Sequence, residues 1–197
     1  MNICSYSYKE YVNLVKSFHG YVAPGVVVGG FMVDLAVKNL PKDILFDAMS
    51  ETSACLPDAI QLLTPCTIGN GWLKVFNMGR FAIALYEKYE GEGIRIFIDP
   101  NKLEIWPEIK TWFFKLKPKK ESDSQLLLEE IEGAGASICG IQQVKVPPQF
   151  RKKKHRSGFA ICPLCKEAYP VDDGEICHAC QGETPYVVTE APERSKR

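Results

Sequence analysis

The chain has 197 residues, with 24 basic and 24 acidic side chains, so its formal net charge is zero. This balance excludes the strong overall field that draws a whole molecule to nucleic acid or to an anionic membrane. Its apolar fraction of 46% excludes global disorder. The length suits one core domain with a small appendage.

Targeting signals and membrane segments are not apparent in the sequence. Lys9 and Glu10 fall within an amphipathic pattern, unlike the basic and then apolar order of a secretory signal. The most apolar run, 21–33, contains Pro24 and is too short to cross a bilayer. We therefore expect a cytoplasmic protein with no membrane partner, whose cysteines bind metal instead of forming disulfides.

The first part of the chain is predicted to be helical. Apolar residues at helical spacing predict one helix over 7–18 and a second over 24–39 that begins at Pro24. Gly29 and Gly30 lie inside the second helix, where each costs ~1 kcal/mol relative to alanine. We expect close contact with a neighbouring element to offset this cost, so this helix should be central and buried.

The stretch 51–71 is expected to hold a short helix with a cysteine at each end, Cys55 and Cys66. Pro57 suits the first helical turn, and Asp58 suits the positive end of the helix dipole. A thiol just ahead of a helix N-terminus has its thiolate stabilised, so Cys55 is a candidate ligand or nucleophile. The alternative, that both cysteines are small buried core residues, is slightly favoured by their spacing alone.

Several separated motifs occur in a fixed order along this part of the chain. They are Phe18-His19-Gly20, Pro24-Gly25, Cys55 with Asp58-Ala59-Ile60-Gln61, Cys66-Thr67 with Gly69 and Gly71, and Gly79-Arg80-Phe81-Ala82. Together, over roughly residues 8–99, they resemble FmdE, a component of formylmethanofuran dehydrogenase, and its relatives. The resemblance implies an accessory protein of one-carbon metabolism, as in methanogenesis. It also implies a homodimer, and association with a molybdenum or tungsten enzyme that interconverts carbon dioxide and formylmethanofuran.

The resemblance also implies a site in the core. Its candidate metal ligands or active-site residues are His19, Cys55, Cys66, Asp58, Gln61 and Thr67. One histidine and two cysteines could hold a second divalent metal, such as zinc with an open fourth position. However, the two cysteines lie at opposite ends of a helix about 10 Å long. Sharing one ion would require the following loop to fold back, or a second chain to contribute.

Two observations weaken this core site. A histidine at a helix junction, such as His19, is often simply hydrogen-bonded, and this alternative stays open. Relatives typically carry a second histidine and a further cysteine where this chain has Tyr21 and Ala23. Part of the ligand set of those relatives is therefore missing here.

The middle of the chain is predicted to form a sheet and two more helices. Strands are expected over 72–76, 81–86 and 94–98, and helices over 107–116 and 124–131. The expected fold is therefore α+β, with helices packed on a mainly antiparallel sheet in a core domain spanning residues 1–146. The aromatic cluster 106–114 is expected in the core or in a dimer interface. The apolar segment 138–146, with Cys139, is expected only to pack.

Residues 147–158 are predicted to be a basic linker, because Pro147-Pro148 precede the run Arg151–Arg156. Such a run could contact nucleic acid. More often it is only a solvated connector, and the neutral total charge favours that reading, so we do not expect nucleic acid as a partner. Residues 191–197 read as a polar tail.

Two CxxC pairs near the C-terminus give the least ambiguous chemistry in the chain. Eleven residues separate the pairs, and the four ligands are Cys162, Cys165, Cys177 and Cys180. Four thiolates form a closed tetrahedral site for structural zinc. We expect a treble-clef or zinc-ribbon module over 159–190, with a hairpin turn at Asp173-Gly174. Disulfides or redox dithiols are alternatives that the compartment and the spacing disfavour.

These features predict a metal-binding accessory protein. The chain has no ferredoxin-type cysteine run, so it is not expected to catalyse the overall reaction alone. Whether it is an enzyme stays open, because a site at His19, Cys55 and Cys66 could act by itself. The alternatives are a zinc-finger regulatory protein that binds nucleic acid or protein, and a purely structural component of a complex.

Overall fold

The computed structural model describes residues 1–121, 123–151 and 157–189. The chain divides into two compact units, Met1–Lys152 and Lys153–Arg197. No helix in the described part of the chain is both long enough and apolar enough to cross a membrane. The basic run 152–156 and the tail from residue 190 onward lie outside the described residues.

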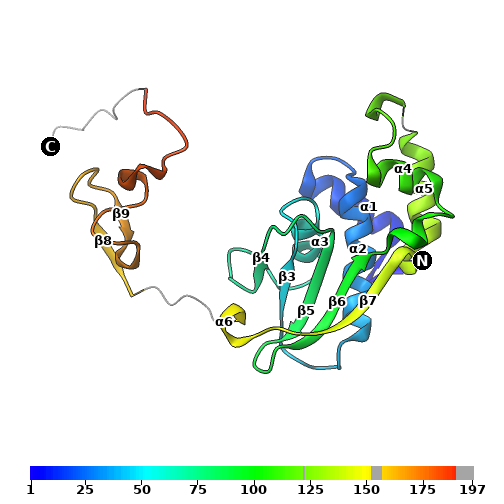
Figure 1. Cartoon of the computed structure of the whole chain (residues 1–197), viewed down its shortest axis with the longest axis horizontal. Helices are drawn as coiled ribbons and strands as arrows, with labels where there is room; N and C mark the ends of the chain where they lie inside the picture. The colour runs from blue at the N-terminus through cyan, green and yellow to red at the C-terminus, as the bar shows by residue number, and fades with distance from the viewer. Residues whose placement is uncertain (122, 152–156, 190–197) are drawn as a thin grey trace. The chain divides into compact units, whose positions relative to one another are not determined.

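The first unit is built on a five-stranded sheet with the order β4-β3-β5-β6-β7 (Figure 1). The strands are β3 (Phe46–Ser50), β4 (Leu73–Val75), β5 (Ala82–Glu87), β6 (Glu92–Ile98) and β7 (Cys139–Lys145). β3 and β4 are parallel, and the other neighbouring strands are antiparallel. A separate two-stranded ladder, β1 (Asn2–Ile3) with β2 (Tyr6–Ser7), precedes the first helix. The predicted α+β fold with a mainly antiparallel sheet is therefore confirmed.

Six α-helices accompany these strands in the described part of this unit. They are α1 (Tyr8–His19), α2 (Pro24–Asn39), α3 (Leu56–Leu63), α4 (Pro107–Phe114), α5 (Ser124–Ala134) and α6 (Pro148–Arg151). α1 begins with a capping box, in which the Ser7 side chain accepts from the Glu10 N–H and the Glu10 side chain accepts from the Ser7 N–H. It ends at Gly20, whose φ of 92° is the left-handed conformation that glycine adopts without strain.

The central helix α2 is buried along most of its length, as its sequence predicted. A Cβ atom at Gly30 would lie 2.3 Å from the ring of Tyr11 on α1, and one at Gly29 would lie 2.7 Å from Ala59 on α3. The Tyr11 hydroxyl donates a hydrogen bond to the carbonyl of Val26, at 2.9 Å. The two glycines therefore let α1 and α3 approach α2 more closely than any side chain would allow.

The two faces of the sheet are filled differently. Side chains such as Ile83 and Ile96 belong to the core beside α2. Alternate residues face the other way. On that face, a Cβ atom added at Gly140 would lie only 2.3 Å from the Phe97 ring. Nearby, Arg95 binds both oxygens of the Glu51 carboxylate, at 2.6 and 2.8 Å, and Arg80 binds one, at 2.6 Å.

The first unit extends beyond residue 146. The Lys74 ammonium on β4 donates to the backbone carbonyls of Phe150 and Arg151, both at 2.7 Å. The rings of Phe76 and Phe150 make an edge contact. These contacts attach α6, which lies in the expected linker, to the sheet.

The second unit contains one small hairpin, formed by β8 (Phe159–Ile161) and β9 (Ala168–Pro170). Its turn lies at the first CxxC pair, where the Cys162 N–H donates to Glu167 and the Lys166 N–H donates to Cys162. The predicted hairpin turn at Asp173-Gly174 is wrong. Asp173 instead ends a 3-10 helix, Val171–Asp173, that follows β9.

Candidate metal centre and core cavity

The four cysteines of the second unit converge on one point. Their sulfur atoms all lie within 4.8 Å of one another. The Cys162–Cys180 distance is 3.8 Å and the Cys165–Cys177 distance is 3.7 Å. A tetrahedral zinc ion with Zn–S bonds of about 2.3 Å places its sulfurs about 3.8 Å apart. The donor set and its spacing therefore fit one zinc ion.

The electrostatics of this cluster favour a bound cation. Backbone hydrogen bonds, first from Cys177, lower the pKa of the Cys162 thiol to about 6. The neighbouring Cys177 thiol raises the pKa of Cys180 to about 12, because adjacent sulfurs cannot all carry negative charge unaided. A divalent ion would remove this conflict and hold all four groups as thiolates.

His178 lies between two of these ligands in sequence but is not part of the cluster. Its Nδ1 atom lies 3.0 Å from the Glu183 carboxylate, and its Nε2 atom lies 3.5 Å from that of Asp173. These contacts, led by the hydrogen bond that the His178 ring donates to Glu183, raise the pKa of His178. The four cysteines thus form a closed site, with no position left for a substrate.

In the first unit, the structure pairs two of the predicted site residues directly. His19 is the last residue of α1, and its Nδ1 atom lies 2.6 Å from the Asp58 carboxylate on α3. The ring of Tyr21 packs edge-on against His19, at 5.0 Å between centroids. This is the hydrogen-bonded arrangement at a helix junction that the sequence left open.

Cys55 is the N-cap residue of α3 and adopts φ 59°, ψ −51°, which is unusual for a residue with a side chain. Burial, and then the Asp58 charge, raise the pKa of its thiol. The expected stabilisation of the thiolate by the helix N-terminus is therefore outweighed. A Cβ atom at Gly25 would lie 2.7 Å from the Cys55 sulfur, so a glycine there leaves room for the thiol.

The other predicted core residues organise the loop after α3. The buried Cys66 thiol contacts the carbonyl of Phe46, at 3.5 Å. Gln61 accepts from the N–H of Ile68, and Thr67 exchanges hydrogen bonds with Asn70.

The structure does not bring His19, Cys55 and Cys66 together within one chain. Among the described residues, the four-cysteine cluster is the only group of three or more such ligands whose atoms lie within 4.8 Å of one another.

A cavity of about 780 Å³ opens beside Cys55. One wall is formed by residues 21–25, at the start of α2, and the opposite wall by Trp112 and Leu116 of the α4 region with Leu127 of α5. Lys115 and Lys117 lie at this cavity, and no Asp or Glu is among the described residues that line it. Tyr21 and Ala23, which stand where relatives typically carry a histidine and a cysteine, both line it.

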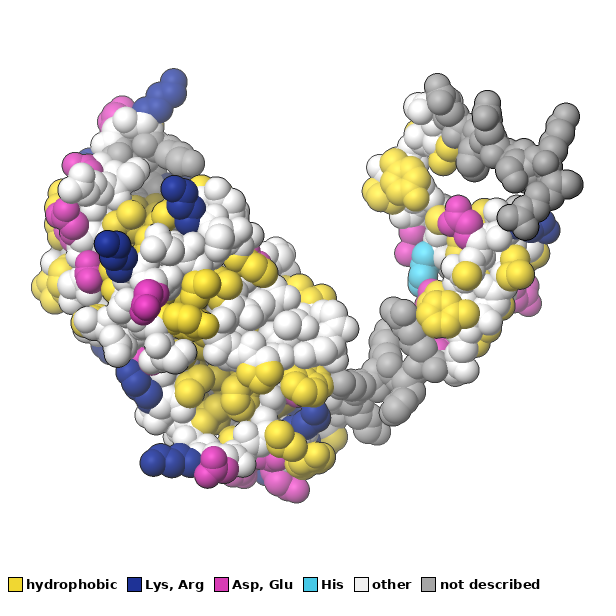
Figure 2. Space-filling model, turned by 180° about the vertical axis from the view of Figure 1, so that it is seen from behind, with side chains coloured by type: hydrophobic (Ala, Val, Ile, Leu, Met, Phe, Trp, Pro, Cys, Tyr) yellow, Lys and Arg dark blue, Asp and Glu magenta, His cyan; other side chains and the backbone are white. Residues whose placement is uncertain are grey.

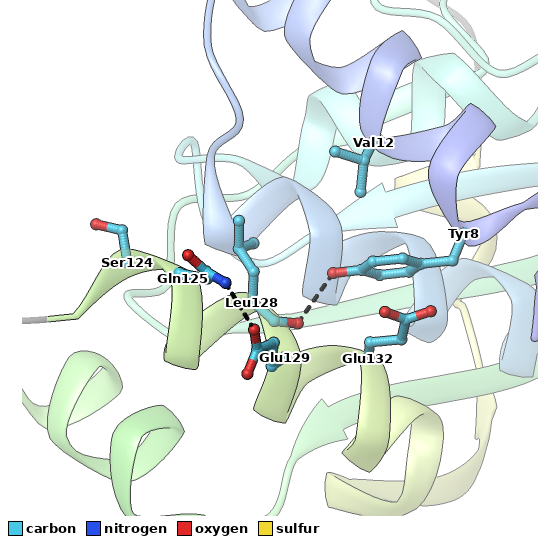
Figure 3. A pocket seen from close by; sticks show the side chains of 7 residues that line it. All are labelled: Tyr8, Val12, Ser124, Gln125, Leu128, Glu129 and Glu132. Atoms are coloured by element: carbon cyan, nitrogen blue, oxygen red, sulfur yellow. Dashed lines mark hydrogen bonds between the residues drawn. The ribbon is translucent and has the colours of Figure 1, made fainter.

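A second, smaller cavity of about 450 Å³ lies between α1 and α5 (Figure 3). It shares Ser124 and Leu128 with the first cavity but carries two carboxylates, Glu129 and Glu132. The Tyr8 hydroxyl donates to the Leu128 carbonyl, at 3.0 Å. Burial and the charge of Glu132 raise the pKa of this phenol to about 12. The two adjoining cavities thus have opposite charge.

The family model described as "FmdE, Molybdenum formylmethanofuran dehydrogenase operon" matches residues 18–146, which include most of the first unit. This chain belongs to the FmdE family. A second model, the FmdE treble clef zinc finger, matches residues 153–187 and so includes all four cysteines.

Two proteins similar to this FmdE chain are matched over different shares of their own length. A tungsten formylmethanofuran dehydrogenase FmdE-like protein from Syntrophus aciditrophicus, known from its crystal structure, is 57% identical. The match covers 94% of this chain and 98% of that one, with a TM-score of 0.87. A probable S-adenosyl-L-methionine-binding protein from Archaeoglobus fulgidus is 27% identical over 203 residues. That match covers 88% of this chain but 53% of the relative, so this chain spans about half of that protein's length.

Sequence reasoning did not find the far wall of the FmdE cavity. Trp112 was expected only in a core or interface cluster, and Lys115 and Lys117 were not singled out. A basic and aromatic segment just after a helix is a weak signal by itself. Its meaning depends on the packing of α4 and α5 opposite Cys55.

Proposed function

We propose that this FmdE-family chain is a metal-binding accessory protein that works with a molybdenum or tungsten formylmethanofuran dehydrogenase in one-carbon metabolism. The observation that carries the proposal is the match of each unit to an FmdE family model, together with a cysteine cluster whose spacing fits zinc. In this proposal, the zinc stabilises the second unit, which is too small to bury a sufficient core by itself.

Two features support an accessory role over independent catalysis. The four-cysteine site is closed, so a zinc ion there has no open position for a substrate. The other four cysteines, Cys4, Cys55, Cys66 and Cys139, belong to no group of three or more potential metal ligands within 4.8 Å of one another in the described residues. On the face that Figure 2 shows, acidic and basic side chains of the described residues are interspersed, without the single basic patch typical of nucleic-acid-binding surfaces.

Metal counting on the purified protein tests the metal content. We expect one zinc per chain, lost in a Cys177→Ser/Cys180→Ser variant and unchanged in a Cys55→Ser/Cys66→Ser variant. A second ion that disappears in the latter variant would instead show a metal in the core, with ligands rearranged or supplied by a second chain.

Sedimentation of the zinc-loaded protein, with and without a purified formylmethanofuran dehydrogenase, tests the partner. We expect a homodimer alone and a larger complex when the enzyme is added. The Cys177→Ser/Cys180→Ser variant shows whether the second unit is needed for this complex. Failure to form a complex at tens of micromolar of both proteins would contradict the accessory role. A shift with DNA or RNA at low salt would favour the regulatory alternative.

Binding of S-adenosylmethionine is a second candidate function. The Archaeoglobus relative is described as a probable binder of this molecule, and its match covers 88% of this chain. A cavity of about 780 Å³ is in the range typical of small-molecule sites. Isothermal titration with S-adenosylmethionine tests this directly, and the absence of binding at millimolar concentration would eliminate it.

A further inference from the structure

The cavity beside Cys55 is lined by two residues with unusual backbone conformations. Two of its residues, Cys55 and Lys115, hold positive φ angles of 59° and 53°. Residues with side chains adopt such conformations rarely, and Lys115 does so as the C-cap of α4. Gly25 leaves the space that the Cys55 sulfur occupies. The inner end of the cavity is therefore shaped by a glycine and a thiol.

The walls of this cavity are apolar and partly aromatic. Trp112 is half-buried, and Leu127 is almost fully buried beside it. Leu116, in the same segment, is 61% exposed, which leaves apolar surface uncovered at this wall. Flat apolar molecules gain most from such a wall, because an indole ring offers a large rigid contact area.

The charge of the cavity is positive. Lys115 and Lys117 lie two residues apart, just after α4, and both line it. In the described part of the chain, the structure gives the Lys115 ammonium no acidic partner. Lys117 has only a long contact with Glu108, at 4.0 Å. The adjoining cavity carries the negative charges of Glu129 and Glu132, which repel anions. An anion would therefore be directed to the cavity that holds Cys55.

We propose that this cavity binds a small organic anion with a flat apolar body, which packs against the wall formed by Trp112 and Leu127 while its anionic group pairs with Lys115 and Lys117. The proposal rests on the cavity alone and is independent of the accessory role. It assigns to the core an organic ligand, where the resemblance had implied a metal.

The test uses full-length, zinc-loaded protein and 1-anilinonaphthalene-8-sulfonate, an aromatic sulfonate whose fluorescence rises in apolar surroundings. The charge variant is Lys115→Asn/Lys117→Gln, in which asparagine suits the left-handed backbone at 115. The matched control is Lys9→Gln/Lys42→Gln, which removes two exposed positive charges that do not line the cavity. N-phenyl-1-naphthylamine provides the same body without the sulfonate.

We expect the charge variant to weaken binding of the sulfonate at least tenfold, with no change in the control. Binding of the neutral amine should be the same in all three proteins. The rate at which iodoacetamide alkylates Cys55, followed by peptide mass spectrometry, reports whether the sulfonate binds in this cavity. Bound sulfonate should lower this rate at least fivefold.

Equal affinity for the sulfonate in the wild type and the charge variant would overturn the proposal. So would an alkylation rate at Cys55 that bound sulfonate does not change. Displacement of the sulfonate by S-adenosylmethionine, equally well from the wild type and the charge variant, would also overturn the preference for anions. Because both lysines are exposed, the charge variant is expected to fold.

Discussion

Replacement of Gly30 by alanine should destabilise the first unit, although alanine is the better helix former. The substitution gains about 1 kcal/mol in helix propensity. Its Cβ atom, however, would lie 2.3–2.8 Å from three atoms of the buried Tyr11 side chain. Overpacking of this kind typically costs about 1–3 kcal/mol. A shifted Tyr11 would also lose its hydrogen bond to Val26, worth about 1 kcal/mol.

The expected balance is a loss of about 1–3 kcal/mol in the free energy of unfolding. For a chain of this size, each kcal/mol lowers the melting temperature by roughly 2–4 °C. The three tryptophans, at positions 72, 106 and 112, all belong to the first unit, so their fluorescence follows that unit alone.

Gly133→Ala on α5 is the matched control, since its Cβ atom would meet Trp106 at an ordinary 3.4 Å. We expect its melting temperature to equal or slightly exceed that of the wild type. A Gly30→Ala/Tyr11→Leu double variant should be more stable than the sum of the single changes predicts. A Gly30→Ala protein as stable as the wild type would refute the close approach of α1 and α2.

Three further predictions concern zinc, an ion pair and a helix cap. Removal of zinc by a strong chelator should make four more thiols react with Ellman's reagent, while the tryptophan fluorescence stays unchanged. A shift in that fluorescence would show that the first unit also depends on the metal. Burial alone would raise the pKa of Glu51, but its bonds to Arg95 and then Arg80 outweigh this and lower the pKa from 4.5. The ion pairs therefore stabilise the fold above about pH 4.5, and this contribution is lost as the pH falls through the lowered value. Glu51→Gln should accordingly lower the free energy of unfolding by about 1–3 kcal/mol at pH 7, and the difference from the wild type should become smaller in acid. Urea titrations at pH 7 and pH 3.5 measure this difference, and a difference that does not change with pH would contradict the role of the ion pairs. Ser7→Ala should cost about 1 kcal/mol by removing the cap of α1, whereas Ser17→Ala, near the other end of that helix, should change the urea midpoint less.

The helices could be predicted from sequence because their signals are local. α2 begins at Pro24 and ends at Asn39, as expected, since proline fits the first turn and the apolar run continues to that point. The four zinc ligands could be predicted equally well, because the spacing within and between the CxxC pairs is itself the signal.

Two strands of the sheet were not found from the sequence. β3 carries Asp47, which is buried, and so its five residues do not show a clear alternation of apolar and polar side chains. β7 is an edge strand in which Gln142 and Gln143 are consecutive and exposed. Both strands are specified by their neighbours in the sheet more than by their own residues.

The core cavity could not be predicted because its two walls are far apart in the sequence. Residues 21–25 and Cys55 meet Trp112 and Leu127 only after α5 has packed beside α2 and α4 has packed on α5. The sequence did identify Cys55 and the neighbouring His19–Asp58 region as unusual. It could not show that Cys66 lies elsewhere, because this depends on the loop after α3.

The close contact between the Phe97 ring and Gly140 makes the two faces of the sheet differ in the substitutions that they tolerate. On the helix side, isoleucines and valines of similar volume can be exchanged with modest penalty, because neighbouring side chains repack. On the other side, any residue larger than glycine at 140 would meet the Phe97 ring, and at 93 it would meet the backbone of Leu85 and Tyr86. A saturation library would therefore show Ile83 and Ile96 accepting other aliphatic residues of similar volume, while Gly93 and Gly140 would accept almost no substitution.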